Sequence, residues 1–595
     1  MQTFLDDVAK IITASQDELN RIKVIVPTIR AIDFLKSALK KQIDIPQFAP
    51  QIISVEQFIS ELSGLKKISK IDLISSFYSI YQEIAPKKEQ DSLNEFFAWA
   101  PSLLQEFNEI DAQLVDPKSI FAFMGAVDKI ENWQKETRDL LGKHSVEFQS
   151  KVPNYYNRLY SKLLEEQKGY SGMHYREAVR NLGFYLESDL PSHFFVGFNA
   201  LTHAEETIFQ ELIAEGKAEI IWDIDLEFFE DSLHSAAYFI RSYFNNWNVL
   251  KRKKKQEFSN HFSKPKTIEI IGAVKNVSQA QIAVELATKI CKEYPNESTV
   301  LVLGDENLLH PTLAVLPHEE IPWNVTMGYP LRDTTLFSFY SNYLELQESR
   351  EEGGYPLNQV KELIQHALID TFLERSGFPI KKILGKLEKS NKRIISAEVL
   401  TGHNRNADLL FTPFEGVTSF LNRMLALSDG LIEFYQNQKR DPVLVSCSNT
   451  FNSIWKLLEE YHLEKDHIRT IADIRVLFND WVEKEKLDFT GDAHSGLQIM
   501  GVLETRLLDF DNVIITHLNE GILPFGKTPF SWIPFDVRKK FGMNTFIEQD
   551  HLYAYHIFRL LQRAKNIHLL YNSVPEGLFS GENSLFIVQF EYLKK

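Results

Sequence analysis

The amino-acid sequence predicts an α/β protein with two parallel sheets, each interrupted by a mainly helical insertion. Short β-branched runs alternate with helix-periodic runs in two regions, around residues 190–223 and again from residue 267 onwards. Strands that alternate with helices along a chain form parallel sheets. The stretches at about 70–190 and 335–490 instead carry apolar residues at the spacing of amphipathic helices. Four segments follow: a first sheet domain at 1–65 and 190–262, its insertion at 66–189, a second sheet domain at 263–335 and 491–595, and its insertion at 336–490.

The length and composition indicate a multidomain globular protein. A chain of 595 residues is too long for one hydrophobic core, and 44% hydrophobic with 25% charged residues is ordinary for a globular chain. Two cysteines, Cys291 and Cys447, exclude a disulfide framework and an all-cysteine metal site. The start, MQTFLDDVAKII, lacks a signal-peptide pattern, and no apolar run approaches the length of a membrane span. We therefore expect a cytoplasmic protein without a membrane partner.

The formal net charge of −16 argues against binding nucleic acid by bulk attraction. It leaves room for a focal basic channel, because basic residues gather at several places. Each such cluster is, on its own, typical of a solvated face. The clusters are Lys251–Lys255, Lys381 to Arg393, Arg538–Lys540, and Arg559 with Arg563 and Lys565.

The first sheet is predicted from three buried strands and the helices that follow them. A helix at Ile52–Leu62 is expected to begin at the N-cap Ser54, with Gln57 as its capping partner. Asp223 and Asp225 either bind a metal ion or end a strand, and two carboxylates without further ligands favour the second interpretation. The predicted strands are Lys23–Pro27, Phe194–Phe198 and Ala218–Asp223, and the helices after the first two are Thr28–Leu39 and His203–Ile213.

The second sheet is predicted from a longer series of strands. Glu504, Thr505, Arg506 and Asp509 follow one of them, at the edge where open α/β sheets bind ligands. The predicted strands are Ile268–Ile271, Ser298–Leu303, Pro322–Pro330 with its turn, Leu497–Met500, Val513–Leu518 and Ile567–Tyr571, and the helices are Val277–Glu293, Asp305–Leu316 and Glu548–Lys565.

The segment Gly521–Thr528 fits the letters of the phosphate-binding P-loop. A P-loop needs small residues, so that backbone N–H groups wrap the phosphates, and then a helix. Here the loop holds Leu523, Pro524 and Phe525, and Pro524 has no N–H to donate. Pro529 and Pro534 follow and would interrupt a helix. The pattern therefore favours a turn after a buried strand.

Two α/β lobes with helical insertions resemble the plan of superfamily-one helicases, whose lobes are RecA-like (P-loop-type) sheets. Leu503–Pro524 resembles the helicase motif that contacts DNA and links it to ATP. Tyr555–Lys565 resembles the helix whose arginine reaches the γ-phosphate, and Arg563 holds that position. Ala280–Val284 and Val300–Leu303 resemble the entry of the second motor lobe.

The departures from that family concern catalysis. In the family, the strand before the helix at His203 ends in Asp-Glu, which holds Mg²⁺, whereas here it ends in Gly197-Phe198-Asn199. The first sixty residues also contain no phosphate cradle. Metal-assisted phosphoryl transfer needs both parts, so we expect no catalytic residue, metal site or cofactor in this chain. The resemblance leaves vestigial nucleotide-site positions at Gly197, Phe198, Asn199, Glu504 and Arg563.

The chain is most similar to the AddB/RecC type, a helicase-shaped subunit without ATPase activity in bacterial double-strand-break repair and recombination. In particular it resembles the N-terminal helicase-like part of the AddB-like PD-(D/E)XK nuclease family proteins of Bacteroidetes. The resemblance implies a heterodimer with an AddA-like helicase-nuclease subunit, which would hold the ATP and Mg²⁺. It implies DNA, single-stranded or as a duplex end, as the ligand, and a C-terminal nuclease domain that is absent from these 595 residues.

The main hypothesis is therefore a non-catalytic DNA-binding scaffold. One alternative is an active DNA-stimulated ATPase that uses Gly521–Thr528, and another is a protein-interaction subunit that does not touch DNA. Each candidate arginine has the competing interpretation of a salt bridge to the acidic background. The candidate DNA-binding residues are Arg30, Thr505, Arg506, Arg559 and Arg563.

Overall fold

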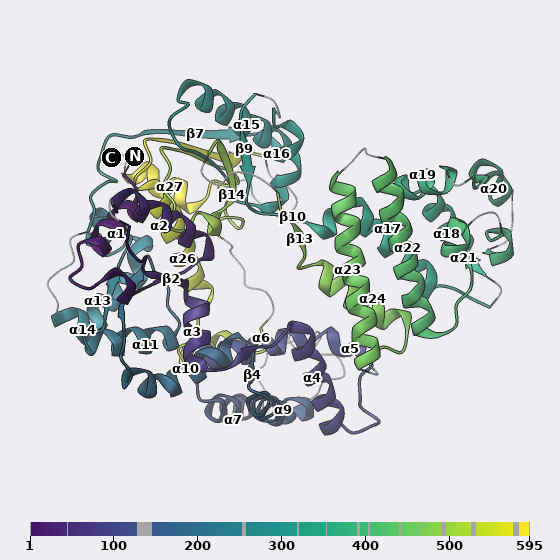
Figure 1. Cartoon of the computed structure of the whole chain (residues 1–595), viewed down its shortest axis with the longest axis horizontal. Coiled ribbons are helices and arrows are strands. Elements are labelled where there is room, and N and C mark those ends of the chain that lie inside the picture. The colour runs from purple at the N-terminus through teal and green to yellow at the C-terminus, as the bar shows by residue number, and fades with distance from the viewer. Residues whose placement is uncertain are drawn as a thin grey trace. The chain divides into compact units, whose positions relative to one another are not determined.

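The computed structural model forms two compact units, and Figure 1 shows their elements. Unit 1 consists of Met1–Pro86, Pro101–Met327 and Thr490–Lys595, and unit 2 of Lys87–Ala100 and Gly328–Phe489. The structure describes residues 2–43, 46–127, 146–252, 258–317, 320–352, 354–375, 377–389, 393–402, 405–438, 442–465, 467–489, 495–524, 531–574 and 582–593.

The first sheet of unit 1 has four parallel strands in the order β2-β1-β5-β6. Its central strand β1 pairs on both sides, with Val24 opposite Ile52 of β2 and Phe194 of β5. The strands are β1 Ile22–Val26, β2 Gln51–Ser54, β5 Ser192–Val196 and β6 Ala218–Ile221. The helices around the sheet are α1 Phe4–Thr13, α2 Ile29–Gln42, α3 Val55–Ser63 and α11 His203–Ala214.

The edge strand β2, Gln51–Ser54, is not among the predicted strands. The helix after it begins at Val55, as the predicted N-cap Ser54 requires. The β-branched pair Ile52 and Ile53 completes the sheet beside β1. Ser54 still caps the helix as predicted, since its side chain accepts a hydrogen bond from the Gln57 backbone N–H at 3.2 Å.

The second sheet of unit 1 has six parallel strands in the order β7-β16-β15-β8-β14-β9. Every residue of β8 and β15 is buried, as expected for a parallel sheet covered on both faces. The strands are β7 Thr267–Ala273, β8 Thr299–Leu303, β9 Trp323–Val325, β14 Leu497–Gly501, β15 Asn512–Ile515 and β16 Asn566–Asn572. The helices of this part are α15 Lys275–Glu293, α16 Leu309–Val315, α25 Phe535–Lys540, α26 Phe546–Leu561 and α27 Leu585–Leu593, of which α25 and α27 are not predicted from the sequence. The prediction of an α/β protein with parallel sheets is confirmed.

The remaining elements of unit 1 are mainly helices. A buried carboxylate, Asp111, organises the first group: it accepts hydrogen bonds from the hydroxyls of Tyr156 and Tyr170 and from the Arg176 guanidinium. That group contains α4 Lys70–Ile84, α6 Ala100–Ala112, α7 Pro117–Val127, α9 Val146–Glu165, α10 Ser171–Leu186 and the short pair β3 Lys66–Lys67 with β4 Lys168–Gly169. After β6 come α12 Leu226–Glu230, α13 Tyr238–Asn246 and α14 Asn248–Arg252.

Unit 2 is a helical bundle with an aromatic core, in which Trp455 stacks on Phe478 at 4.6 Å between ring centroids. The sequence assigns residues 87–100 to the first insertion, but in the structure they belong to this unit, where α5 packs on α24. The spacing of apolar residues in the sequence indicates that α5 buries one face, but it does not identify the helix on which that face packs. The helices are α5 Leu93–Phe97, α17 Thr335–Glu348, α18 Leu357–Ile364, α19 Ala367–Arg375, α20 Ile380–Glu388, α21 Arg405–Phe411, α22 Gly416–Gln438, α23 Pro442–Glu464 and α24 Ile471–Val482. Two short antiparallel pairs complete it: β10 Tyr329–Pro330 with β13 Lys486–Leu487, and β11 Tyr355–Pro356 with β12 Ile394–Ile395.

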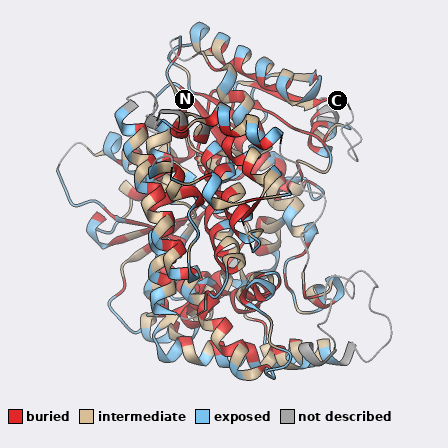
Figure 2. Cartoon of the chain, turned by 90° about the vertical axis from the view of Figure 1, so that its right-hand side faces the viewer, coloured by how far each residue is buried: buried red, intermediate tan, exposed pale blue. Residues whose placement is uncertain are grey.

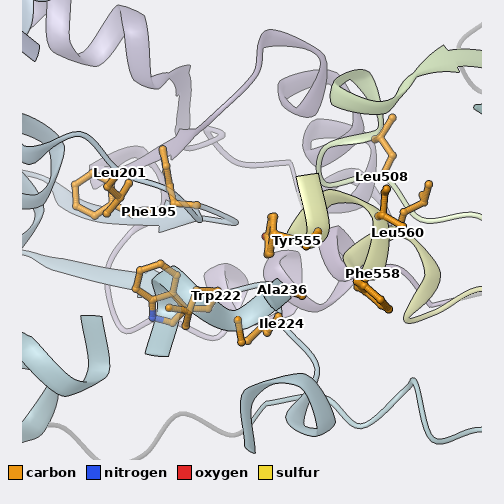
Figure 3. Close-up of a cluster of buried hydrophobic side chains, with 14 of the residues drawn as sticks. Phe195, Leu201, Trp222, Ile224, Ala236, Leu508, Tyr555, Phe558 and Leu560 are labelled. Atoms are coloured by element: carbon orange, nitrogen blue, oxygen red, sulfur yellow. The ribbon is translucent and has the colours of Figure 1, made fainter. Parts of the chain in front are cut away.

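One continuous hydrophobic core joins the two sheets of unit 1. Helices throughout the chain bury one side and expose the other (Figure 2). Among the described helices, none has both the length and the apolar character that crossing a membrane requires. Figure 3 shows part of the shared core, with Phe195, Leu201 and Trp222 from the first sheet's side and Leu508, Tyr555, Phe558 and Leu560 from the second sheet's side.

Candidate functional site

The carboxyl ends of β1 and β5 lie against a loop that follows β14 of the second sheet. This loop, residues 502–511, opens with a 3-10 turn at Val502–Thr505. Leu507 of the loop is buried in one hydrophobic cluster with Val26 of β1 and Val196 of β5. Open α/β sheets bind ligands outside the carboxyl ends of their strands. In this protein, side chains from the second sheet's loop occupy part of that edge.

Leu507 fills the space directly beside Gly197, the residue that follows β5. A Cβ atom placed on Gly197 would lie 1.9 Å from the Leu507 Cδ2 atom, and Gly197 has φ +66°. Leu507 itself adopts φ +64°, a region that non-glycine residues rarely occupy. Such a conformation persists only where the surroundings impose it. The loop is thus held in a strained conformation that inserts an apolar side chain at the edge of the first sheet.

Beside Leu507 lies a buried ionic cluster of Asp223, Asp509, Arg559 and Arg563, here called the arginine–aspartate cluster. Arg559, from α26, is 1% exposed. Its Nε atom lies 2.5 Å from Asp223 Oδ2 and its Nη2 atom 2.8 Å from Asp509 Oδ1. Its Nη1 atom donates to the backbone carbonyls of Thr505 at 3.0 Å and Leu508 at 2.5 Å. Every nitrogen of this guanidinium therefore has an acceptor.

Arg563, four residues further on, completes the cluster. Its Nη1 atom lies 2.9 Å from Asp223 Oδ1, an oxygen that also accepts from Gln562 Nε2 at 2.6 Å. Its guanidinium carbon lies 5.6 Å from the centre of the Phe4 ring. The Phe4 backbone N–H donates to Asp509 Oδ2 at 2.7 Å, so the start of α1 closes the cluster. The cluster joins the end of β6, the loop after β14, α1 and α26.

The electrostatics of the cluster are balanced. Burial alone would raise the pKa of Asp223, but the guanidinium groups of Arg559 and Arg563 outweigh burial and hold that pKa below its ordinary value. Burial would lower the pKa of Arg559, whereas the carboxylates of Asp223 and Asp509 raise it above its ordinary value. Two buried cations thus face two buried anions. Buried charges are tolerated when they are paired and hydrogen-bonded in this way.

The structure therefore corrects the DNA-binding assignment of Arg559 and Arg563, whose guanidinium groups are used inside the protein and offer no surface to a nucleic acid. Thr505 is also unavailable to a nucleic acid, because it is 1% exposed and its hydroxyl donates to the Val502 carbonyl at 2.7 Å. Sequence reasoning placed Asp223 at a strand end and did not pair it with α26. The available signal was a lone aspartate directly after a buried strand.

Arg30 is the accessible candidate. It lies in the first turn of α2, directly after β1, with a side chain that is 31% exposed. Its Nη1 atom is itself buried, lies 3.8 Å from Glu504 Oε2 and has no hydrogen-bond partner among the described residues. Glu504 also accepts a hydrogen bond from the Thr326 hydroxyl, at the end of β9. The neighbouring Ile29 is 74% exposed.

Arg506 is half-buried between the two sheets. Its Nε atom donates to His556 Nε2 at 3.2 Å. Burial, with help from Arg506 and Arg559, lowers the pKa of His556 well below its ordinary value, so the imidazole is a neutral acceptor. Burial also lowers the pKa of Arg506. The guanidinium has no carboxylate within 4.0 Å in the described part of the chain.

Two other positions that the resemblance marks as vestigial nucleotide-site residues, Phe198 and Asn199, are buried. Phe198 packs edge-on against Phe209 at 5.0 Å between ring centroids. Asn199 is 6% exposed, and its amide has no hydrogen-bond partner among the described residues. Asp225 is used structurally, because its Oδ2 atom accepts from the His261 and Phe262 backbone N–H groups at 2.6 and 3.0 Å. Within the ranges that the structure describes, no three His, Cys, Asp or Glu side chains gather in a way that fits a metal ion.

The P-loop-like segment is described only as far as Pro524; Phe525 to Thr528, including Lys527, lie outside the described residues. The described part turns back after β15, with the Leu523 backbone N–H donating to the Asn519 carbonyl at 3.0 Å. Leu523 is buried, and its carbonyl accepts from the Ser584 hydroxyl at 2.5 Å.

Comparison with known proteins adds no assignment: no protein-family model matches the chain, and no curated protein matches it.

Proposed function

We propose that this chain is a non-catalytic, helicase-like scaffold that binds DNA. In this proposal the two parallel sheets are RecA-like lobes, and the chain is the AddB/RecC-like partner of an active AddA-like motor subunit in double-strand-break repair. ATP and Mg²⁺ belong to that partner. The support comes from the two parallel sheets that share one core, and from the protein side chains that occupy the edge where a motor would hold its nucleotide.

The state of Arg563 supports the absence of ATP hydrolysis. An arginine finger acts by stabilising charge on the transferred phosphoryl group. Here the Arg563 guanidinium is already neutralised by Asp223 at 2.9 Å. A triphosphate at this edge would have to break the arginine–aspartate cluster and displace Leu507 from its place beside Gly197. Both changes would leave buried charges or apolar surface without partners, which is costly.

The observation that best supports the proposal of DNA binding is the positive charge of the helix α2 together with the place where this helix begins. In a chain of net charge −16, this helix has four cations (Arg30, Lys36, Lys40 and Lys41) against one carboxylate, Asp33. It begins at the carboxyl edge of the first sheet, where its N-terminus and Arg30 favour an anionic ligand, whereas Lys40 and Lys41 lie in its last turn and Lys41 pairs with Asp6 at 3.7 Å. Phosphate contacts supply most of the affinity for single-stranded nucleic acid.

The test is a titration of a labelled single-stranded oligonucleotide at several salt concentrations. Arg30→Ala is expected to weaken binding several-fold and to reduce the slope of log K against log salt by about one, because one phosphate contact is lost. The matched control is Arg21→Ala, an exposed arginine at the other end of β1 whose partner is Asp189 at 2.8 Å. An unchanged slope in Arg30→Ala, or equal losses in both variants, would refute the site.

A further inference from the structure

A second structural feature, which shares no residue with the candidate site, is the segment Ser531–Thr545 between β15 and α26. This segment, here called the strap, contains α25 and leaves the second sheet to pack on the helices of the first insertion. The strap contributes Ile533, Val537 and Met543 to a buried cluster with Ile110, Val115 and Ile120 of the insertion.

The strap is fastened by one buried carboxylate, Glu106 of α6, which is 5% exposed. Its Oε1 atom accepts from the Ser531 hydroxyl at 2.5 Å and from the Trp532 backbone N–H at 3.0 Å. Its Oε2 atom lies 3.0 Å from Arg538 Nη1. Burial raises the pKa of Glu106 against the opposing effects of Ser531 and Arg538. One side chain thus binds the strap at three points.

Further contacts surround this carboxylate. The Trp532 indole N–H donates to the Ser102 hydroxyl at 2.8 Å, and Arg538 also pairs with Glu109. Arg538 Nε donates to the Asn544 carbonyl at 2.8 Å, which fixes the strap's own turn. The partners that join the insertion to the strap lie more than 400 positions apart in the sequence, with a separation of 426 for Glu106 and Trp532. The contact therefore closes a long loop between the insertion and the second sheet.

We propose that the strap is a clasp that fixes the first insertion to the second sheet, with Glu106 as its central positioning residue. When the Glu106 contacts are lost, the strap detaches as one unit while both sheets stay folded. Local units of this kind open with their own free energy, below that of global unfolding. The inference stands independently of DNA binding, since it rests on packing and ion pairs inside unit 1.

The test is hydrogen exchange of the full chain followed by mass spectrometry. In Glu106→Ala, amides in Trp532–Met543 are expected to exchange about a hundred-fold faster, because Arg538 loses its buried partner, while amides of β8 and β15 keep their rates. Glu106→Gln keeps an acceptor oxygen and should give an intermediate increase. Glu83→Ala, which removes an exposed pair with Arg158 on the same insertion, is the control and should change nothing.

Two results would overturn the clasp. One is unchanged exchange of the strap in folded Glu106→Ala. The other is acceleration of β8 and β15 to the same extent as the strap, which would mean that Glu106 supports the whole unit. If Glu106→Ala does not fold, the same comparison in Glu106→Gln decides between these outcomes.

Discussion

At the scale of single residues, Asp223 has the central role in this protein. It is fully buried and receives Arg559, Arg563 and Gln562 at once. A buried ion pair adds little to the free energy of unfolding when it is compared with apolar residues in its place. Removing only one partner lowers that free energy strongly, because an uncompensated charge then remains in the interior. The contact between the two sheets is therefore sensitive to the loss of any one charged member of the cluster.

We expect Asp223→Ala to lower the free energy of unfolding by about 3–5 kcal/mol, because two guanidinium groups lose a buried partner. Chemical denaturation at neutral pH measures this change. The Asp223 pKa is depressed in the folded state, so its contribution is present above the unfolded value of about 3.9 and is lost as pH falls through the folded pKa. The control is Asp189→Ala, which breaks the exposed pair with Arg21 and should cost about 1 kcal/mol or less. Equal costs in the two variants would contradict the role of Asp223.

The sequence places Arg559 of α26 and Arg563 just after it in one basic cluster, but it does not show what these two guanidinium groups contact. A basic residue in a helix gives the same sequence pattern whether its side chain contacts a phosphate or a carboxylate. The partner of Arg559 lies 336 positions away, at the end of β6. Only the fold brings these two residues together, so the sequence alone leaves salt bridge and DNA contact as equal alternatives. Arg30 differs, because its place at the carboxyl end of β1 follows from the strand that directly precedes it in the sequence.

At the scale of elements, the loop after β14 is held by its fit to the end of β5. Gly197→Ala should destabilise the protein by more than about 1 kcal/mol, since φ +66° disfavours a side chain and the new methyl would meet Leu507. Leu507→Ala should cost about 2–5 kcal/mol through the cavity it leaves. In the double variant the alanine methyl at 197 takes part of the vacated space. The double variant should therefore be more stable than the sum of the single losses indicates.

A double-mutant cycle in chemical denaturation measures this coupling. The expected interaction is favourable, because the steric conflict of Gly197→Ala disappears when Leu507 is truncated. Strictly additive losses would show that Leu507 and Gly197 are not in the contact described here.

The strands were predictable because parallel strands covered on both faces appear as short apolar runs, as in β8 and β15. The edge strand β2 was not, since its four residues run directly into a helix and share that helix's apolar spacing. The grouping of α5 with unit 2 was also beyond the sequence. Helical periodicity identifies a buried face, whereas its partner depends on tertiary packing.

At the scale of the whole molecule, unit 1 holds two parallel sheets together by three means: a shared hydrophobic core, the arginine–aspartate cluster and the insertion of Leu507. Under the proposed scaffold function, Arg563 would take the place of a motor's arginine finger, and its guanidinium already pairs with the buried carboxylate of Asp223 at 2.9 Å. The helix α2 would then be the part that meets DNA.

The most direct test of this account is a measurement of ATP turnover by the purified chain with Mg²⁺ and saturating single-stranded DNA. We expect no hydrolysis above background, and no difference between the wild type and Lys527→Ala. DNA-stimulated turnover that Lys527→Ala abolishes would contradict the account, because it would show an active phosphate site in a chain that is proposed to have none.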